Sequence, residues 1–167
     1  MNLSLEKIPS PIGTILLVSD GEAIRALDFE DYEPRMMQIL RRHYGAVELV
    51  EGPAPPGVRD AIAAYFAGTI GAIDRLATAT AGTEFQRDVW KTLREIPAGA
   101  TWSYGQLAKH IGKPKAMRAV GLANGSNPIA IVVPCHRVIG ANGSLTGYGG
   151  GMERKRWLLA HEGAAHA

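Results

Sequence analysis

The single cysteine of this 167-residue sequence, Cys135, is preceded by Pro134 and followed directly by His136 and Arg137. The thiolate is the nucleophilic form of cysteine, and a nearby positive charge or hydrogen-bonding base lowers the pKa of the thiol. His136 and Arg137 offer both kinds of group, while Pro134 lacks a backbone donor and stiffens the chain. A cysteine that only packs as a small apolar side chain is the alternative. The neighbours of Cys135 favour the nucleophile.

The lone cysteine also limits the kinds of site and compartment that we expect. One cysteine cannot form an internal disulfide or a thiolate-rich zinc site, so no metal is expected. The chain is 46% hydrophobic and 20% charged, as in ordinary globular proteins. No apolar run is long enough to cross a bilayer, and residues 1–8 lack the pattern of a signal peptide. We therefore expect a cytoplasmic protein with no membrane partner.

The net charge of +2 hides an uneven distribution along the chain. Residues 1–82 contain 7 Lys/Arg and 11 Asp/Glu, which leaves −4, whereas residues 83–167 contain 11 Lys/Arg and 5 Asp/Glu, which leaves +6. No acidic residue lies between residues 96 and 152. An acid-free basic surface favours a polyanion, because each neutralised phosphate releases counterions. A basic face that is only solvated is the alternative.

The first half of the chain alternates short apolar runs with turn signals, which predicts a small sheet with helices. Asp20 and Gly21 mark a turn, so the apolar segments on either side of them are predicted to be paired strands. Strands are expected at residues 12–17 and 24–29, helices at 34–44 and 58–66, and a Pro/Gly-rich loop at 51–57. This half contains no concentrated chemical motif, so we expect it to act mainly as a scaffold.

Residues 78–82 are small and polar, and they are our candidate linker between two domains. An α/β domain is then expected over residues 1–78 and a mostly helical domain over residues 83–167. The fold class predicted for the whole chain is therefore α/β in the mixed, α+β sense.

Two capping boxes mark helix starts in the second half, one from Thr83 to Gln86 and one from Ser103 to Gln106. The second box opens a short helix, which a Gly-Lys-Pro turn interrupts before an Ala-rich helix at residues 115–122. Two helices joined by a tight turn, with Lys115 and Arg118 near the start of the second, form a helix-turn-helix pattern. Because this pattern coincides with the acid-free stretch, it indicates a DNA-binding element.

The segment after the helix-turn-helix pattern leads to the cysteine. Residues 124–128 are expected to form a loop, and the fully apolar residues 129–133 are predicted to be a buried strand that delivers Cys135 at its end. A glycine-rich segment at residues 141–151 follows, and a last helix is expected at residues 155–161.

The sequence around Cys135 resembles the active-site signature of the O6-alkylguanine-DNA alkyltransferases, a family that repairs O6-methylguanine. The resemblance is dense over residues 83–163, thin before them, and follows the family in order and spacing. Its motifs are Ser103-Tyr104-Gly105-Gln106-Leu107-Ala108, Arg118-Ala119-Val120-Gly121, Asn127-Pro128, Pro134-Cys135-His136-Arg137-Val138, Gly147-Tyr148 and Trp157-Leu158-Leu159-Ala160-His161-Glu162-Gly163.

The resemblance implies that Cys135 accepts an alkyl group directly, once and irreversibly. It implies a chain from Glu162 through His136 and a water to Cys135, in which the carboxylate orients the imidazole and stabilises its charge. The water is needed if a strand continues through Cys135, because His136 then points to the opposite face. Asn127 resembles a hinge asparagine between the recognition helix and the active-site strand, and its place before Pro128 disfavours helical backbone.

The resemblance also implies how DNA is bound, because a guanine inside a duplex must be flipped out before it can react. Arg118 resembles an arginine finger that fills the vacated space. Tyr104 resembles a residue that crowds the phosphate and protonates the leaving guanine. The other residues expected in the base pocket or at the DNA surface are Ser103, Lys115, Val138, Tyr148 and Gly149. Without the resemblance, a solvated Arg118 and core tyrosines would be the simpler interpretation.

Some features depart from the pattern of other members. Gly149 stands where some carry Ser, so a hydrogen bond to O6 there must come from a backbone N–H. Asn124 replaces an apolar residue on the recognition helix, which is expected to alter contact with the minor groove. The zinc ligands and the cysteine-rich N-terminal extension of some relatives are missing, so phosphotriester repair and a transcriptional switch are not expected.

We therefore expect a suicidal DNA repair protein that moves the alkyl group of O6-alkylguanine, and of O4-methylthymine, in double-stranded DNA to Cys135 without a cofactor. A monomer is expected, with cooperative binding to DNA left open. Three alternatives remain: a lesion-binding relative, which would lack the cysteine; a helix-turn-helix regulator with a buried Cys135; and a cysteine hydrolase that turns over. Transfer of one alkyl group to each protein molecule would distinguish a suicidal repair protein from all three alternatives.

Overall fold

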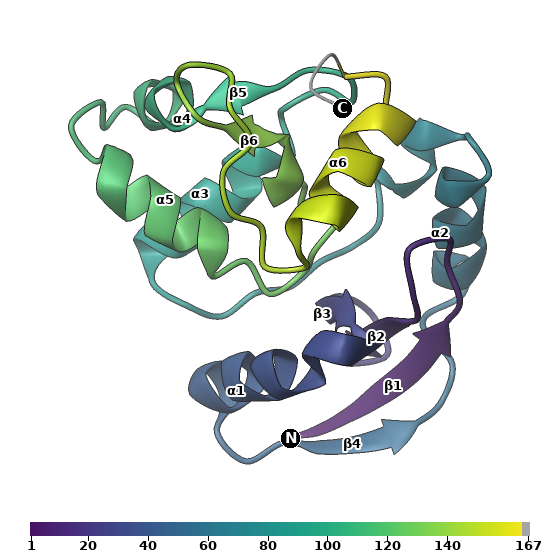
Figure 1. Cartoon of the computed structure of the whole chain (residues 1–167). Coiled ribbons are helices and arrows are strands. Elements are labelled where there is room, and N and C mark those ends of the chain that lie inside the picture. Colours follow the sequence, from purple (N-terminus) through teal and green to yellow (C-terminus); the bar gives the residue numbers. More distant parts are fainter. Residues whose placement is uncertain (165–167) are drawn as a thin grey trace. The chain divides into compact units, whose positions relative to one another are not determined.

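The computed structural model describes residues 1–164, and the chain divides into two compact units (Figure 1). The N-terminal unit consists of Met1–Ala81 and Pro128–Val132, and the C-terminal unit consists of Gly82–Asn127 and the chain from Val133 onward. Helices and small sheets occur together, so the predicted mixed fold class is confirmed. No helix within residues 1–164 has the length and apolar character needed to span a bilayer.

The N-terminal unit is built on a four-stranded sheet in the order β3-β2-β1-β4. The strands are β1 (Asn2–Ile8), β2 (Ile15–Ser19), β3 (Ile24–Phe29) and β4 (Glu48–Glu51). β1–β2 and β2–β3 are antiparallel, and β4 is parallel to β1. The Asp20 carboxylate accepts hydrogen bonds from the N–H groups of Glu22 and Ala23, which closes the predicted turn between β2 and β3. The expected strand pair is therefore confirmed, with β2 beginning three residues later than predicted.

The predicted helices of this unit are also present, as α1 (Glu33–Tyr44) and α2 (Val58–Phe66). Two short 3₁₀ helices, η1 (Glu30–Tyr32) and η2 (Ile70–Ile73), flank them in the chain. Met36 and Leu40 lie four residues apart and therefore on one face of α1, from which they join a buried cluster with Leu16 and Val18 of β2. The hydrophobic core of the unit thus lies between α1 and the sheet (Figure 1).

The linker prediction was wrong for the first residues of the segment 78–82. Thr78 forms a parallel bridge with Ile24. The Ile24 N–H donates to the Ala77 carbonyl (2.9 Å), and the Ala79 N–H donates to the Ile24 carbonyl (3.0 Å). Small polar composition suggested a linker, but β3 is an edge strand whose backbone groups need partners, and these residues supply them.

The C-terminal unit is mostly helical, as expected. Its helices are α3 (Glu84–Leu93), α4 (Tyr104–His110), α5 (Met117–Gly125), α6 (Met152–His161) and the 3₁₀ helix η3 (Cys135–Arg137). Two short parallel strands, β5 (Trp102–Ser103) and β6 (Val138–Ile139), join the start of α4 to the residues just after Cys135. The loop predicted at residues 124–128 begins late, because α5 continues to Gly125.

Both capping boxes are formed as predicted. The Thr83 hydroxyl accepts from the Gln86 N–H (3.1 Å), and the Gln86 side chain accepts from the Thr83 N–H (3.0 Å). Ser103 and Gln106 make the same reciprocal pair at the start of α4 (3.0 and 2.7 Å). The Trp90 indole N–H donates to the Ala123 carbonyl (2.8 Å) and so links α3 to α5. These contacts stabilise the helices on which the candidate DNA-binding residues lie.

The strand predicted at residues 129–133 is wrong, although these five residues are buried. Only Ile129 pairs with the sheet, in an isolated parallel bridge with Leu27. Ile131 has a φ of 69°, and the Val132 N–H donates to the Ala130 carbonyl (2.8 Å), which makes a tight three-residue turn. A left-handed backbone is strained for a β-branched residue, and the burial of this apolar run stabilises the turn in place of further strand pairing beyond Ile129.

Candidate functional site

Cys135 lies at the start of η3, directly after a second tight turn. The Cys135 N–H donates to the Val133 carbonyl (2.8 Å), and Pro134 between them has φ −83° and ψ 65°, the values of an inverse γ-turn. The ring of Pro134 restricts φ to this region, so the sequence itself favours the turn. Cys135 is half-buried, so part of it remains accessible from solvent.

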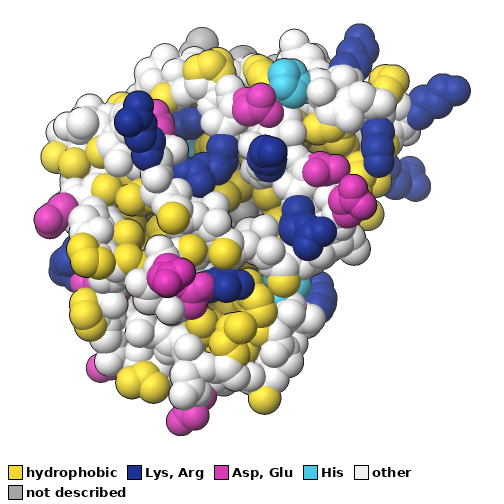
Figure 2. All heavy atoms as spheres, turned by 180° about the vertical axis from the view of Figure 1, so that it is seen from behind, with side chains coloured by type: hydrophobic (Ala, Val, Ile, Leu, Met, Phe, Trp, Pro, Cys, Tyr) yellow, Lys and Arg dark blue, Asp and Glu magenta, His cyan; other side chains and the backbone are white. Residues whose placement is uncertain are grey.

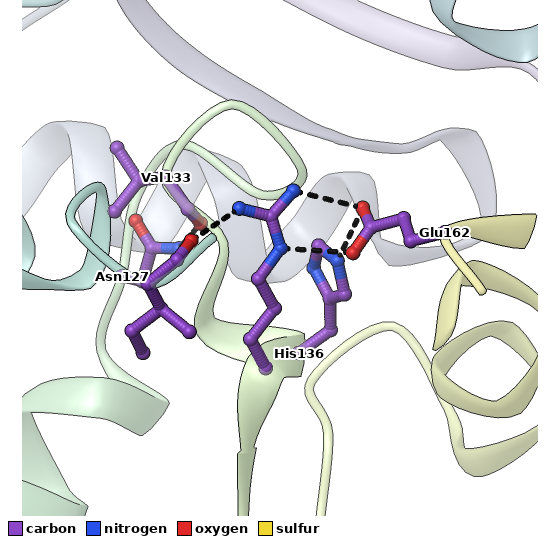
Figure 3. Close-up of polar contacts among 6 residues, drawn as sticks. Asn127, Val133, His136 and Glu162 are labelled. Atoms are coloured by element: carbon purple, nitrogen blue, oxygen red, sulfur yellow. Dashed lines mark hydrogen bonds and ion pairs between the residues drawn. The ribbon is translucent and has the colours of Figure 1, made fainter. Parts of the chain in front are cut away.

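Two asparagines near the end of α5 bracket this turn. The Asn127 side-chain amide donates to the Val133 carbonyl (2.8 Å), and the pair is drawn in Figure 3. The Asn124 amide lies 3.5 Å from the Cys135 carbonyl, and Asn124 is buried. The expectation that Asn124 alters contact with the minor groove does not fit this placement, because its side chain is directed to the cysteine turn and away from solvent. The helix is thus joined to the backbone on both sides of Pro134.

His136 and Glu162 form a pair with no solvent exposure of either side chain. The His136 Nε2 atom lies 2.9 Å from Glu162 Oε2 (Figure 3). We expected His136 to point away from Cys135 because successive side chains of a strand face opposite sides. The chain forms the 3₁₀ helix η3 at Cys135, so this rule does not apply. The structure therefore brings together two of the predicted site residues that are far apart in the sequence.

Arg137 completes this buried cluster and does not act as we expected. Its Nε and Nη2 atoms donate to the two oxygens of Glu162 (2.8 and 3.1 Å), and Nη1 donates to the Ile96 carbonyl (2.7 Å). The sequence predicts Arg137 as a positive group beside the sulfur, but its guanidinium is engaged by Glu162. Its role is to neutralise and orient the carboxylate, through the bidentate geometry that a guanidinium allows.

The electrostatics of the pair follow from its burial and its partners. Burial alone would raise the pKa of Glu162, but hydrogen bonds and charge from His136 and Arg137 outweigh it and lower the pKa to about 2. Burial lowers the pKa of His136, against the opposing effect of Glu162. Near neutral pH the site therefore holds an ionised carboxylate and a neutral imidazole. With Nε2–H directed to the carboxylate, Nδ1 is the basic nitrogen, and within residues 1–164 no protein group hydrogen-bonds to it.

Lys155 is a site residue that sequence analysis missed. Its side chain is fully buried on α6, and its Nζ atom donates to the Val138 carbonyl (2.7 Å) and the Thr146 carbonyl (3.1 Å). Burial lowers the pKa of Lys155 to about 8, although the charge of Cys135 acts to raise it. The signal was available: Lys155 precedes the buried Leu158 and Leu159 by three and four residues, so all three share the inward face of α6.

The remaining residues that we expected in the base pocket lie near η3 and β6 in the chain or in space. Val138 is fully buried, and the Tyr148 ring lies edge-on to the His136 ring with centroids 6.5 Å apart. Gly149, next to Tyr148, is exposed. The Tyr104 hydroxyl lies 2.8 Å from the Thr146 hydroxyl, in the glycine-rich segment between β6 and α6. Val138 and Tyr148 thus lie next to the segment that carries Cys135, and Tyr104 contacts the glycine-rich segment that follows it.

The predicted DNA contacts form a separate, exposed group. Arg118 in the first turn of α5 and Lys115 just before this helix are exposed, and α5 also exposes the large apolar side chains of Met117 (52%) and Leu122 (70%). Figure 2 shows Lys and Arg side chains projecting from the face that carries α4 and α5. The Ser103 hydroxyl serves as a helix cap, and its contact with DNA stays a prediction. Within residues 1–164 no group of three or more His, Cys, Asp or Glu is arranged to hold a metal ion.

Comparison with known proteins relates both units to one family. Residues 84–164 match the domain described as 6-O-methylguanine DNA methyltransferase, DNA binding domain, and residues 4–78 match the ribonuclease-like domain of 6-O-methylguanine DNA methyltransferase. A methylated-DNA--protein-cysteine methyltransferase of Shigella flexneri is 54% identical over 166 residues, which is 98% of this chain and 97% of that protein. Its namesake in Methanosarcina acetivorans is 49% identical over 155 residues, 93% of this chain and 95% of that protein.

Solved structures agree with the sequence matches. The crystal structure of Mycobacterium tuberculosis O6-methylguanine methyltransferase matches with a TM-score of 0.79 at 45% identity, over 96% of this chain and 93% of that chain. The structure of the Mycobacterium tuberculosis protein in complex with DNA matches with a TM-score of 0.80 at 42% identity, over 99% and 97% of the two chains.

Proposed function

Because the chain belongs to the 6-O-methylguanine DNA methyltransferase family, we propose that it repairs O6-alkylguanine in DNA by moving the alkyl group to its own Cys135. It is a single-turnover enzyme that binds DNA, and the protein itself is the acceptor. O4-methylthymine is proposed as a second substrate and a monomer as the active form. The buried pair of His136 and Glu162 beside the lone cysteine is the observation that carries the assignment to Cys135.

The first step of the proposed reaction is removal of the thiol proton. His136 Nδ1 takes up the proton, directly or through a water, and the imidazole becomes positively charged. Glu162 stays ionised because its pKa is lowered to about 2, and it stabilises the imidazolium at 2.9 Å. Arg137 holds the carboxylate in place during this change. The buried Lys155 ammonium adds a positive charge that favours the thiolate.

The second step is a direct displacement at the alkyl carbon. The Cys135 sulfur forms a bond to this carbon as the bond from carbon to O6 breaks, and the electron pair stays with the guanine. The Tyr104 hydroxyl gives its proton to the guanine and later regains one from solvent, and His136 releases to solvent the proton that it took from the thiol. The product is a thioether, which is a poor leaving group, so each molecule reacts once.

The exposed surface of α4 and α5 is proposed to bind the duplex. The acid-free, basic character of this region suits phosphate contacts. Arg118 is proposed to enter the stack in place of the flipped guanine, and the exposed Met117 and Leu122 offer the apolar contacts that minor-groove proteins use. The need for a reduced thiol agrees with the proposed cytoplasmic location.

The proposal is tested by following the alkyl group. Duplex DNA with a labelled O6-methylguanine is incubated in excess over the protein, and the intact mass and the peptide that contains Cys135 are measured. We expect one methyl group per protein molecule, on Cys135, and none on Cys135→Ser. Label that stays on DNA would support a lesion-binding protein or a regulator, and methyl release with turnover would support a hydrolase. Either result rejects the proposal.

A further inference from the structure

Thr146 lies between two polar side chains that come from different helices. Its hydroxyl is 2.8 Å from the hydroxyl of Tyr104, the first residue of α4. Its carbonyl accepts a hydrogen bond from the ammonium of Lys155 on α6 (3.1 Å). The same ammonium donates to the carbonyl of Val138, which directly follows η3 (2.7 Å). One half-buried residue therefore connects Tyr104 to the segment that carries Cys135.

We infer that Thr146 is a positioning residue for alkyl transfer, whose hydroxyl sets the direction in which Tyr104 presents its proton. The inference rests on the proposed function, because it needs Tyr104 to protonate the leaving guanine. Thr146 lies outside the family motifs of the sequence.

The hydrogen-bond capacity of two hydroxyl groups supports this role. Only one hydrogen lies between the two oxygens, so either Tyr104 or Thr146 donates. When Thr146 donates this hydrogen bond, the Tyr104 hydroxyl hydrogen is free to point toward a guanine bound in the site. A hydroxyl hydrogen rotates readily, so the pair can change from one arrangement to the other when the guanine enters.

The hydrogen bond from the Thr146 hydroxyl to the Tyr104 oxygen becomes stronger as the reaction proceeds. Negative charge develops on the guanine as the carbon–O6 bond breaks, and it passes to the Tyr104 oxygen as the phenolic proton moves to the base. A hydrogen bond donated to a charged oxygen is stronger than one donated to a neutral oxygen. Thr146 keeps its own proton throughout, and Tyr104 regains a proton from solvent. Thr146 therefore contributes more to the transition state than to the bound substrate.

Lys155 fixes where the Thr146 hydroxyl lies. Its Nζ atom joins the carbonyls of Val138 and Thr146, and the side chain is fully buried. The distance between the cysteine segment and the Thr146 backbone is thus set by one ammonium group. The glycines around Thr146, such as Gly147, would otherwise leave this segment free to change conformation.

The test compares Thr146→Val, which keeps the shape and removes the hydroxyl, with Thr146→Ser, which keeps the hydroxyl. Single-turnover rates are measured against increasing concentrations of O6-methylguanine duplex, so that the maximal rate and the half-saturating concentration are separated. We expect Thr146→Val to lower the maximal rate about tenfold with the half-saturating concentration almost unchanged, and Thr146→Ser to restore most of the rate. Thr69→Val, at an exposed position of the N-terminal unit, is the matched control.

A double-variant cycle separates positioning from general support of the segment. In a Tyr104→Phe protein there is no phenolic oxygen to position, so Thr146→Val should have no further effect on the maximal rate. A full tenfold additional loss there, an unchanged rate in Thr146→Val, or an equal loss in Thr146→Ser overturns the inference. Thermal unfolding of each variant identifies a folding defect, and Thr146→Ala then replaces Thr146→Val in the cycle. If the parent protein leaves the methyl group on DNA, the proposed function itself is wrong.

Discussion

The imidazole of His136 and the carboxylate of Glu162 are separated by 26 residues in the chain and by 2.9 Å in the structure. Neither side chain is exposed to solvent. A buried carboxylate at this position fixes which ring nitrogen carries the hydrogen, and it stabilises the imidazolium that forms when the thiol loses its proton. We therefore propose that the reactivity of Cys135 depends on Glu162, which directly follows the last residue of α6.

Replacement of Glu162 by Gln should slow alkyl transfer by about 100-fold, because an amide stabilises an imidazolium much less than a carboxylate does. It should also destabilise the fold by about 3 kcal/mol, since the buried Arg137 guanidinium loses its counter-ion. The rate is measured with free O6-benzylguanine, so that DNA binding is not involved, and stability is measured by urea unfolding. Glu153→Gln, an exposed acidic residue on the same helix, is the control, and an equal loss in both variants would contradict this role.

Acid should unfold the protein partly through Glu162. Its pKa is lowered from 4.5 to about 2 in the folded state, so its contribution to stability is complete above about pH 4.5 and is lost as the pH falls toward 2. A shift of this size corresponds to about 3 kcal/mol. The pKa of His136 is also lowered in the folded state, so protonation of its buried ring in acid destabilises the fold as well. Urea unfolding between pH 2 and 6 should show that the free energy of unfolding falls more steeply with decreasing pH for the parent than for Glu162→Gln. Parallel curves would refute this contribution of Glu162.

Replacement of Lys155 by Met should separate stability from reactivity. The folded pKa of about 8 lies below the ordinary 10.5, so the folded state binds fewer protons and the parent should become more stable as the pH rises from 8 to 10.5. Met removes this pH dependence and the cost of burying a charge. It should also lower the reaction with O6-benzylguanine about tenfold, because the thiolate loses a nearby cation. The exposed Lys91→Met is the control, and a fully reactive Lys155→Met would remove Lys155 from the site.

Replacement of Arg118 by Ala should affect duplex repair and leave the chemistry intact. We expect repair of O6-methylguanine in duplex DNA to slow about tenfold or more, because the flipped state loses the side chain that fills the stack. Reaction with free O6-benzylguanine, which needs no flipping, should change less than about twofold. Arg156→Ala, an exposed arginine on α6, is the control. Equal losses with both substrates would exclude an intercalating role.

Interactions within one turn of the chain could be predicted from the sequence. The capping boxes at Thr83 and Ser103 formed as expected, because donor and acceptor lie three residues apart and meet whenever the helix forms. The family could also be predicted, since the ordered motifs around the lone thiol of Cys135 resemble those of one family, whereas the role of Cys135 itself stays a proposal. The helix-turn-helix pattern followed from local turn residues in the same way.

The tertiary structure alone decided which distant groups meet. An apolar run such as residues 129–133 predicts burial but cannot distinguish a strand from the turns around Ile131, because the choice depends on which backbone partners the sheet offers. Arg137 binds Glu162, and the buried Lys155 binds the carbonyls of Val138 and Thr146. These partners lie 9 to 25 residues away in the chain. Local residue type sets what a side chain can do, whereas long-range packing sets its partner, its burial and therefore its charge state.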